Sequence, residues 1–330
     1  MMTADAVGGV WRHALDLSAA LAARGWRVTL AVSGPAPDAE QAREAEAVAG
    51  LAREVGADLV HLNSPSEAGR TNWPTPLVVT VHSCLATWWR TVRGGPPPAE
   101  WAARIARAKR GLERADALAA PSRAFAAMVA DAYGAALAPL AIHNGAAPVP
   151  HVAAEKREVV LTAGRLWDDG KNVALLDSLA GDLAWPVVAA GPSQGPNGAR
   201  LQAERLTLLG LLPHAELRAR MREAAIYAAP ALYEPFGLAV LEAAQAGCAL
   251  VLSDIPTFRE LWDGAATFAD PRDPAAFRDA LQSAIRDPLL RASLGEAARE
   301  RARAYTLDAQ GAAFDALYRR LLAPALKRAV

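Results

Sequence analysis

Two glutamates, Glu234 and Glu242, enclose seven residues whose types favour an anion-binding site. The apolar residues before Glu234 predict a buried strand, and the small residues after Gly237 predict a helix that ends at Gly247. A helix that begins near Gly237 would point unpaired backbone N–H groups and its positive dipole end at the preceding loop, which suits a phosphate. The carboxylates are suited instead to accept hydrogen bonds from sugar or ribose hydroxyls. An ordinary strand–helix–strand unit with two solvated glutamates is the alternative.

A second group of chemically suggestive residues begins at Gly164-Arg165 and ends at Lys171-Asn172, directly after a predicted strand over 159–163. The glycines and the lysine invite comparison with a Walker A phosphate loop. That comparison fails, because one residue too many separates the glycines and Asn172 stands where Ser or Thr would hold magnesium. Two surface cations in an ordinary loop are the simplest alternative to a phosphate-binding role.

The segment EPFGLAVLEAAQAG, from Glu234 to Gly247, resembles the E-x7-E signature of the retaining GT-B glycosyltransferases of family 4. The segment after Gly164 resembles the G-R-L…K element of the same family, and the resemblance extends over nearly the whole chain. It implies an α/β fold of the GT-B type, in which two doubly wound Rossmann-like domains face a cleft. It also implies transfer of a hexose from a nucleotide-diphosphate sugar to an acceptor hydroxyl, with retention of configuration.

The resemblance also implies roles for single residues. Arg165 and Lys171 would neutralise the donor diphosphate, Glu234 would orient the donor sugar together with nearby backbone N–H groups, and Glu242 would hold the ribose hydroxyls. Backbone around Leu212 would frame the nucleobase. The implied catalytic residues are His82, Arg165, Lys171 and Glu234. The implied donor-binding residues are Gly8, Gly9, Gly164, Arg165, Lys171, Leu212, Glu234, Phe236, Gly237, Leu238 and Glu242.

The first half of the chain alternates short apolar runs with helical stretches, which predicts a parallel, doubly wound sheet. The expected strands are 28–32, 59–62, 77–81, 117–120 and 140–142. Ligands bind at the carboxyl ends of such strands. His61, His82, Ser122 and Asn144 lie at such ends, and His82 matches a family histidine that lies close to the transferred sugar. A structural histidine at the sheet edge is the alternative.

The N-terminal segment places Gly8-Gly9 before a helix predicted over 11–24, which is typical of a phosphate loop. Few residues precede these glycines, so the first strand is expected to be truncated. We expect an acceptor-side domain over 1–152, a nucleotide-sugar domain over 153–305, and a C-terminal helix over 306–330 that crosses back to the first domain.

The composition excludes some classes of partner. The 330 residues carry 35 basic and 35 acidic side chains, so no net charge favours nucleic acid. Two distant cysteines, no signal peptide and no long apolar run predict a cytoplasmic protein. The absence of a D-x-D motif fits a metal-independent enzyme with no cofactor.

Two features suggest an acceptor and a location. Trp88, Trp89, Arg90 and Arg93 suit a carbohydrate or lipid-linked acceptor, although a loop packed against the sheet is the favoured reading. A basic helix over 99–114 suggests peripheral contact with the inner membrane face, although a solvated charged face is the simpler reading. A nicotinamide oxidoreductase is disfavoured because no G-x-G-x-x-G follows a strand. A non-catalytic sugar-nucleotide-binding relative stays open.

Overall fold

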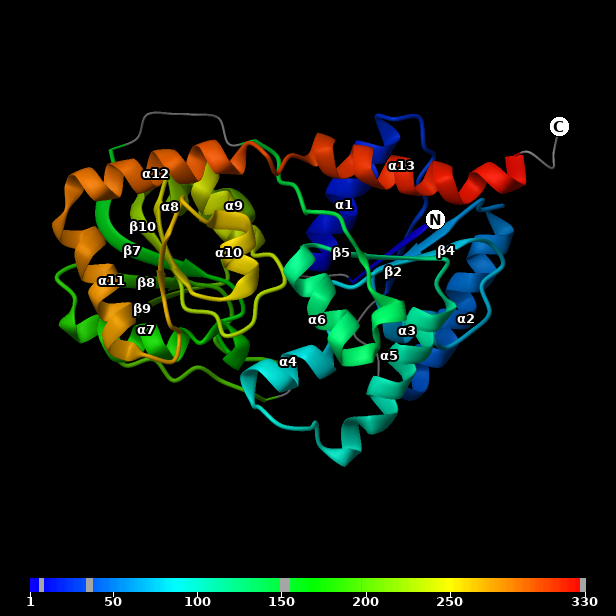
Figure 1. Cartoon of the computed structure of the whole chain (residues 1–330), viewed down its shortest axis with the longest axis horizontal. Helices are drawn as coiled ribbons and strands as arrows, with labels where there is room; N and C mark the ends of the chain where they lie inside the picture. The colour runs from blue at the N-terminus through cyan, green and yellow to red at the C-terminus, as the bar shows by residue number, and fades with distance from the viewer. Residues whose placement is uncertain (6–8, 34–37, 149–154, 197, 327–330) are drawn as a thin grey trace. The chain divides into compact units, whose positions relative to one another are not determined.

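The computed structural model of the chain describes residues 1–5, 9–33, 38–148, 155–196 and 198–326. The chain divides into two compact units (Figure 1). The N-terminal unit consists of Met1–Ala147 together with Leu307–Val330, and the C-terminal unit is Pro148–Thr306. The division between the units therefore falls a few residues before the expected boundary at 152/153.

The N-terminal unit is built on a six-stranded parallel sheet with the order β2-β1-β3-β4-β5-β6. The inner strands β3 and β4 are short buried apolar runs, as expected for parallel strands that are covered on both faces. The strands are β1 Met2–Asp5, β2 Leu30–Ser33, β3 Val60–Leu62, β4 Leu77–Thr80, β5 Ala117–Ala120 and β6 Leu140–Ala141. The helices are α1 Gly9–Ala22, α2 Asp38–Glu54, α3 Pro65–Ala68, α4 Leu85–Val92, α5 Ala102–Arg114, α6 Arg123–Tyr133 and α13 Leu307–Leu326. The predicted alternation of strands and helices is confirmed.

The first strand is short but occupies its place in the sheet. β1 pairs in parallel with β2 on one side and with β3 on the other. Met2 is buried, and the ammonium group of Met1 donates a hydrogen bond to the Leu59 carbonyl at 2.7 Å. The backbone groups of this central position therefore have partners in the sheet.

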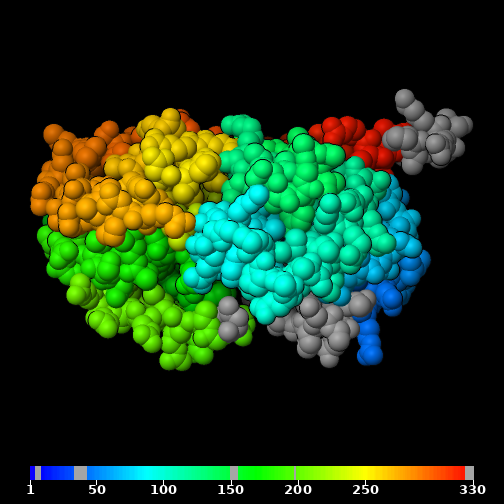
Figure 2. Space-filling model, turned by 60° about the horizontal axis from the view of Figure 1, so that its bottom comes forward, coloured from blue at the N-terminus to red at the C-terminus, as the bar shows by residue number. Residues whose placement is uncertain are grey.

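Residues 85–92 form helix α4 rather than the loop expected there. The Cys84 thiol accepts a hydrogen bond from the Thr87 N–H and so caps the helix. Trp89 packs edge-on against Trp101, with 4.8 Å between ring centroids. The cyan region of Figure 2, which contains α4 and the start of α5, lies on the surface of the N-terminal unit.

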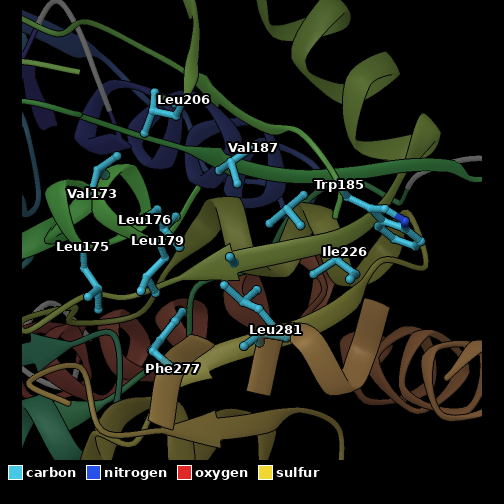
Figure 3. Packing of buried hydrophobic residues seen from close by; sticks show 14 of the residues in the cluster. Val173, Leu175, Leu176, Leu179, Trp185, Val187, Leu206, Ile226, Phe277 and Leu281 are labelled. Carbon is cyan, nitrogen blue, oxygen red and sulfur yellow. The ribbon is translucent and has the colours of Figure 1, made fainter. Parts of the chain in front are cut away.

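The C-terminal unit repeats this architecture with the strand order β12-β11-β10-β7-β8-β9. Its strands are β7 Arg157–Ala163, β8 Val187–Ala190, β9 Thr207–Gly210, β10 Ala224–Ala229, β11 Ala249–Ser253 and β12 Thr267–Ala269. Its helices are α7 Val173–Leu179, α8 His214–Glu223, α9 Leu238–Gln245, α10 Pro256–Trp262, α11 Pro274–Arg286 and α12 Pro288–Ala302. Figure 3 shows how side chains of α7 and α11, among them Leu176 and Leu281, converge with Ile226 of β10 in one core.

The last helix, α13, returns to the N-terminal unit and packs on α1. Phe314, Leu317 and Tyr318 are buried at the helical spacing that the sequence predicts. Trp26 donates a hydrogen bond from its indole nitrogen to Asp315 at 2.6 Å. The far end of the sequence therefore completes the core of the domain in which the chain begins.

Helices α3 and α5 approach each other so closely that they need glycine at their contact. A Cβ added at Gly111 would lie 1.8 Å from the Pro65 carbonyl oxygen, and one added at Gly69 would lie 2.4 Å from the Arg107 carbonyl oxygen. Side chains at these positions would force the backbones apart.

We predict that Gly111→Ala destabilises the protein by roughly 1–3 kcal/mol, because the new methyl group overlaps a backbone carbonyl. Gly50→Ala is the matched control, since Gly50 is also helical and its added Cβ meets no described atom within 4 Å. That substitution should stabilise by about 1 kcal/mol through helix propensity. Urea denaturation followed by tryptophan fluorescence measures both. Equal midpoints for Gly111→Ala and wild type would contradict the close contact.

Candidate functional site

Two loops of the C-terminal unit lie side by side at the carboxyl edge of its sheet. One follows β7 and the other follows β10, and these strands are neighbours in the sheet. The Gly170 carbonyl accepts hydrogen bonds from the N–H groups of Leu232 at 2.9 Å and Tyr233 at 3.1 Å. These bonds hold the predicted cationic loop against the loop that carries Glu234.

Asn172 makes a second connection between the same loops. Its backbone is left-handed, with φ of +53°, which asparagine tolerates better than most residues. Its side-chain Nδ2 donates to the Pro230 carbonyl at 3.1 Å and to the Pro271 carbonyl at 3.0 Å. Asparagine therefore suits this position both by its backbone preference and by its amide group.

Lys171 and Glu234 meet as a direct ion pair between Nζ and Oε2. The lysine side chain is 23% exposed and the glutamate side chain 14%, so the pair lies mostly out of water. A partly desolvated pair interacts more strongly than one on the surface. The structure thus brings together two predicted catalytic residues that are 63 positions apart in sequence.

Arg165 is held by a residue that the sequence analysis did not select. Its Nη2 donates to Asp168 Oδ2 at 2.8 Å, while Asp168 Oδ1 accepts the Gly170 N–H at 2.9 Å. Asp168 is buried and the Arg165 side chain is 56% exposed. Because a guanidinium has five N–H donors, Arg165 keeps donors for a ligand. The sequence feature that could have identified Asp168 is its position three residues after Arg165.

The start of α9 needs glycine at position 237. Gly237 has φ of +90°, and an added Cβ would lie 3.2 Å from side-chain atoms of both Phe258 and Val240. Phe236 is buried and packs edge-on against Tyr305, with ring centroids 5.8 Å apart. The Phe236 N–H points to Glu234 Oε1 at 3.5 Å, too long for a strong hydrogen bond. The amino end of α9, which begins at Leu238, is therefore anchored beside Glu234.

Glu242 is paired with His214, a contact that the sequence analysis missed. His214 Nε2 lies 2.6 Å from Glu242 Oε1, with the side chains 37% and 14% exposed respectively. His214 is the first residue of α8 and follows the half-buried Leu212 by two positions. The His214 imidazole therefore lies beside Glu242, the carboxylate that is predicted to hold the ribose hydroxyls.

Helices α8 and α9 are tied together at their other ends by Lys156. Its ammonium group donates to the carbonyls of Ala224 and Ala246, each at 2.9 Å, and of Met221 at 3.3 Å. A cation at the carboxyl ends of two helices is stabilised by their dipoles. Burial lowers the pKa of Lys156 below its ordinary value. This positioning residue gave no signal in the sequence.

His82 of the N-terminal unit lies just beyond the end of β4, as predicted. Its Nε2 is 2.8 Å from Asn63 Oδ1, and its ring centroid lies 4.3 Å from that of His13. Burial, with the nearby His13 and His61 rings, holds the pKa of His82 well below its ordinary value. The ring is therefore neutral at physiological pH.

His61 is a core residue, not a ligand-facing one. It is 1% exposed, and its two ring nitrogens lie 2.5 Å from the Tyr318 hydroxyl and 2.7 Å from the Thr80 hydroxyl. Gly9 is the first residue of α1, whereas Gly8 lies outside the described residues. Among the predicted catalytic and donor-binding residues, Gly9 and His82 are the two that the structure describes in the N-terminal unit. Gly164 and the remaining ones belong to the C-terminal unit.

No cluster of His, Cys, Asp or Glu suited to hold a metal ion occurs among the described residues. None of the described helices combines the length and apolarity that crossing a bilayer requires.

Comparison with protein families gives two adjoining matches. The family of glycosyl transferases group 1 matches residues 146–301, and glycosyltransferase family 4 matches residues 42–147. Among curated relatives, a phosphatidyl-myo-inositol mannosyltransferase of Mycobacterium leprae is 35% identical over 162 residues, which are 45% of this chain and 42% of the relative. The chain thus matches less than half the length of the curated relatives.

Solved structures match along nearly the whole chain. A sucrose-phosphate synthase from Thermosynechococcus elongatus has a TM-score of 0.81 at 21% identity, over 98% of this chain and 99% of that one. The Anabaena protein HepE in complex with UDP-glucose has a TM-score of 0.76 at 17% identity, over 97% of this chain and 100% of that one. These similarities confirm the predicted GT-B fold.

We predict that Asn172→Ala destabilises the protein by about 3 kcal/mol, because alanine loses both amide hydrogen bonds and is strained at positive φ. Asn172→Gly is the matched control, since it loses the same bonds without the strain. Its loss should be about 1 kcal/mol smaller. Denaturation midpoints measure the difference. If alanine were no worse than glycine, the backbone contribution would be refuted.

We also predict that acid destabilises the N-terminal unit. Burial lowers the pKa of His13 from 6.5 to about 4. The unfolded chain then binds this proton more tightly than the folded one, so stability falls as the pH drops from about 6.5 to about 4 and stays at the lower level below that. At about pH 5 this group alone should cost roughly 2 kcal/mol relative to neutral pH.

The shifts of His61 and His82 have the same sign and add to this loss. Urea denaturation at neutral pH and at about pH 5 measures it. His13→Gln should remove only the share of this loss that comes from His13, because glutamine does not titrate, whereas His61 and His82 keep theirs. Equal stability of the wild type at both pH values would show that the histidines are not held neutral by burial.

Proposed function

The chain belongs to the group 1, family 4 glycosyltransferases, and we propose that it transfers a hexose from a nucleoside diphosphate sugar to an acceptor hydroxyl. In this proposal the configuration at the anomeric carbon is retained and no metal ion or other cofactor takes part. The observation that supports it best is the group formed by Lys171, Glu234 and the amino end of α9 in one unit.

The chemistry of this group suits a departing diphosphate. As the glycosyl bond breaks, negative charge grows on the phosphate oxygens, and fixed donors aimed at that charge stabilise the transition state. Arg165, with its free donors, Lys171 and the N–H groups at the start of α9 are such donors. They take the place that a divalent cation fills in metal-dependent enzymes.

The two glutamates then bind hydroxyls rather than phosphate. Glu234 would orient the hexose and Glu242 the ribose, since carboxylates accept hydrogen bonds from hydroxyls. Glu234 acts as a positioning residue in this proposal, and the contact between its Oε2 and Lys171 holds it in place. Transfer would occur on the front face of the donor, and the leaving phosphate would take the proton of the acceptor hydroxyl.

The acceptor is proposed as a carbohydrate or a lipid-linked molecule. The phosphatidyl-myo-inositol mannosyltransferase named above acts, by its name, on a lipid. The cations Arg104, Lys109 and Arg110 of α5 are exposed, which suits peripheral contact with an anionic inner membrane face in the cytoplasm. Both the location and the membrane contact belong to the proposal.

Calorimetric titration with UDP, GDP and ADP in the presence of EDTA tests the donor site. We expect one nucleotide to bind, and Lys171→Ala to weaken it about 10–100-fold, because a charged hydrogen bond to phosphate is lost. Arg278→Ala is a matched control: this cation lies on α11 and pairs only with its neighbour Asp279 among the contacts described. The Arg278→Ala variant should bind the nucleotide with the affinity of the wild type.

Removing Lys171 also leaves the Glu234 carboxylate without its cation. The double variant Lys171→Ala/Glu234→Gln removes that charge. Comparing it with Lys171→Ala separates the lost attraction between Lys171 and the phosphates from the new repulsion between Glu234 and the phosphates. If none of the three nucleotides binds the wild type, the proposed function is wrong. If a nucleotide binds but its sugar is never transferred or hydrolysed, the chain is a sugar-nucleotide-binding relative without catalysis.

A further inference from the structure

A chain of hydrogen bonds crosses the carboxyl edge of three neighbouring strands in the N-terminal unit. β1 supplies Thr3, the residue after β3 is Asn63, and His82 follows β4 by two positions. Asn63 Nδ2 lies 2.5 Å from the Thr3 carbonyl oxygen, and Asn63 Oδ1 lies 2.8 Å from His82 Nε2. The Asn63 backbone N–H also donates to the Thr3 hydroxyl at 3.2 Å. Three strands thus position one imidazole.

The first bond of this chain fixes which way the Asn63 amide faces. A backbone carbonyl can only accept a hydrogen bond. The side-chain atom that faces Thr3 must therefore be the NH₂ group, because the reversed amide would put two oxygens in contact. Thr3 and Asn63 are both buried, so water does not compete for these groups. The oxygen of the amide is thereby directed at His82.

The second bond then fixes the proton on the imidazole. An amide oxygen accepts, so His82 Nε2 must carry the hydrogen. The ring is neutral, because burial and the His13 and His61 rings lower its pKa. A neutral imidazole has one proton, and Nδ1 is left with its lone pair. Among the residues that the structure describes, Nδ1 of His82 has no hydrogen-bond partner.

We propose that Asn63 is a positioning residue that fixes His82 as the Nε2–H tautomer, so that Nδ1 accepts a hydrogen bond from a substrate hydroxyl. The second half of this statement rests on the proposed function. An acceptor at this point selects a group with a proton to donate. It suits a sugar hydroxyl and disfavours a diphosphate oxygen, which has no proton at neutral pH. His82 would thus recognise the sugar and not the phosphates.

The tautomer is measured directly in the full chain with ¹⁵N-labelled histidine. Long-range ¹H–¹⁵N correlation spectra distinguish Nε2–H from Nδ1–H rings, and the His82 signals are those missing from His82→Gln. We expect a single Nε2–H form in the wild type at neutral pH. A ring protonated at Nδ1, a doubly protonated ring or a mixture of tautomers would overturn the proposal, and this measurement needs no folded Asn63 variant.

Asn63→Ala tests the role of the amide. The His82 signals should become a mixture of tautomers, and kcat should fall about 10-fold, as expected for the loss of one well-placed hydrogen bond. Nucleotide affinity should not change, because the donor-site cations belong to the other unit. Asn144→Ala is the matched control: Asn144 is a buried amide that contacts His13, not His82, so the His82 tautomer should be retained.

The two proposals fail in different ways. Nucleotide binding with an incorrect tautomer overturns only the role of Asn63. The correct tautomer without nucleotide binding leaves the positioning of His82 standing and removes the proposed function. Asn63→Ala with an unchanged tautomer would show that another contact holds the ring.

Discussion

The candidate donor site depends on one backbone acceptor, the carbonyl of Gly170. It accepts two N–H groups from the loop after β10, at Leu232 and Tyr233. Lys171 is the next residue after Gly170, and Glu234 is the next after Tyr233. The ion pair between Lys171 and Glu234 is therefore a consequence of the backbone contact. Asn172 reinforces it from the next position. A site built on hydrogen bonds between two loops is held more rigidly than one built on long charged side chains alone, because less side-chain freedom must be lost.

The polar groups of this site contact one another in pairs. Arg165 is bound to Asp168, Lys171 to Glu234, and Glu242 to His214. Each pair has one member that is mostly buried, so an unpaired charge there would be costly. A diphosphate that entered would compete with carboxylates for the same cations.

The N-terminal unit buries two histidine rings, His13 and His61, whose nitrogens need hydrogen-bond partners. His13 lies with Asn144 and Gln310, and His61 lies with Thr80 and Tyr318. Helix α13 supplies Gln310 and Tyr318 to this layer, so the last helix of the chain satisfies polar groups of the first domain as well as covering its apolar core. A buried polar group with a partner costs little, whereas the same group alone costs about 1–3 kcal/mol. Helix α13 therefore supplies hydrogen-bond partners to His13 Nδ1 and His61 Nδ1 as well as apolar side chains to the core.

The sequence by itself determined the alternation of strands and helices and the α/β class, and it predicted two phosphate-type segments near Gly164 and Gly237. These are local properties: apolar runs of strand length, a glycine at a helix start and cations after a strand. The resemblance to a family added their roles. The sequence could not show that 85–92 is a helix, because its aromatic and basic residues suit a loop equally well.

Only the tertiary structure decided which side chains meet. β10 lies beside β7 although two strands separate them in sequence, and this order places Glu234 on Lys171. His214 reaches Glu242, and Lys156 reaches the ends of two helices, for the same reason. His61 lies within β3 and in the core, whereas His82 lies two residues beyond the end of β4. Such pairings depend on strand order and register, which spacing along a single chain does not encode.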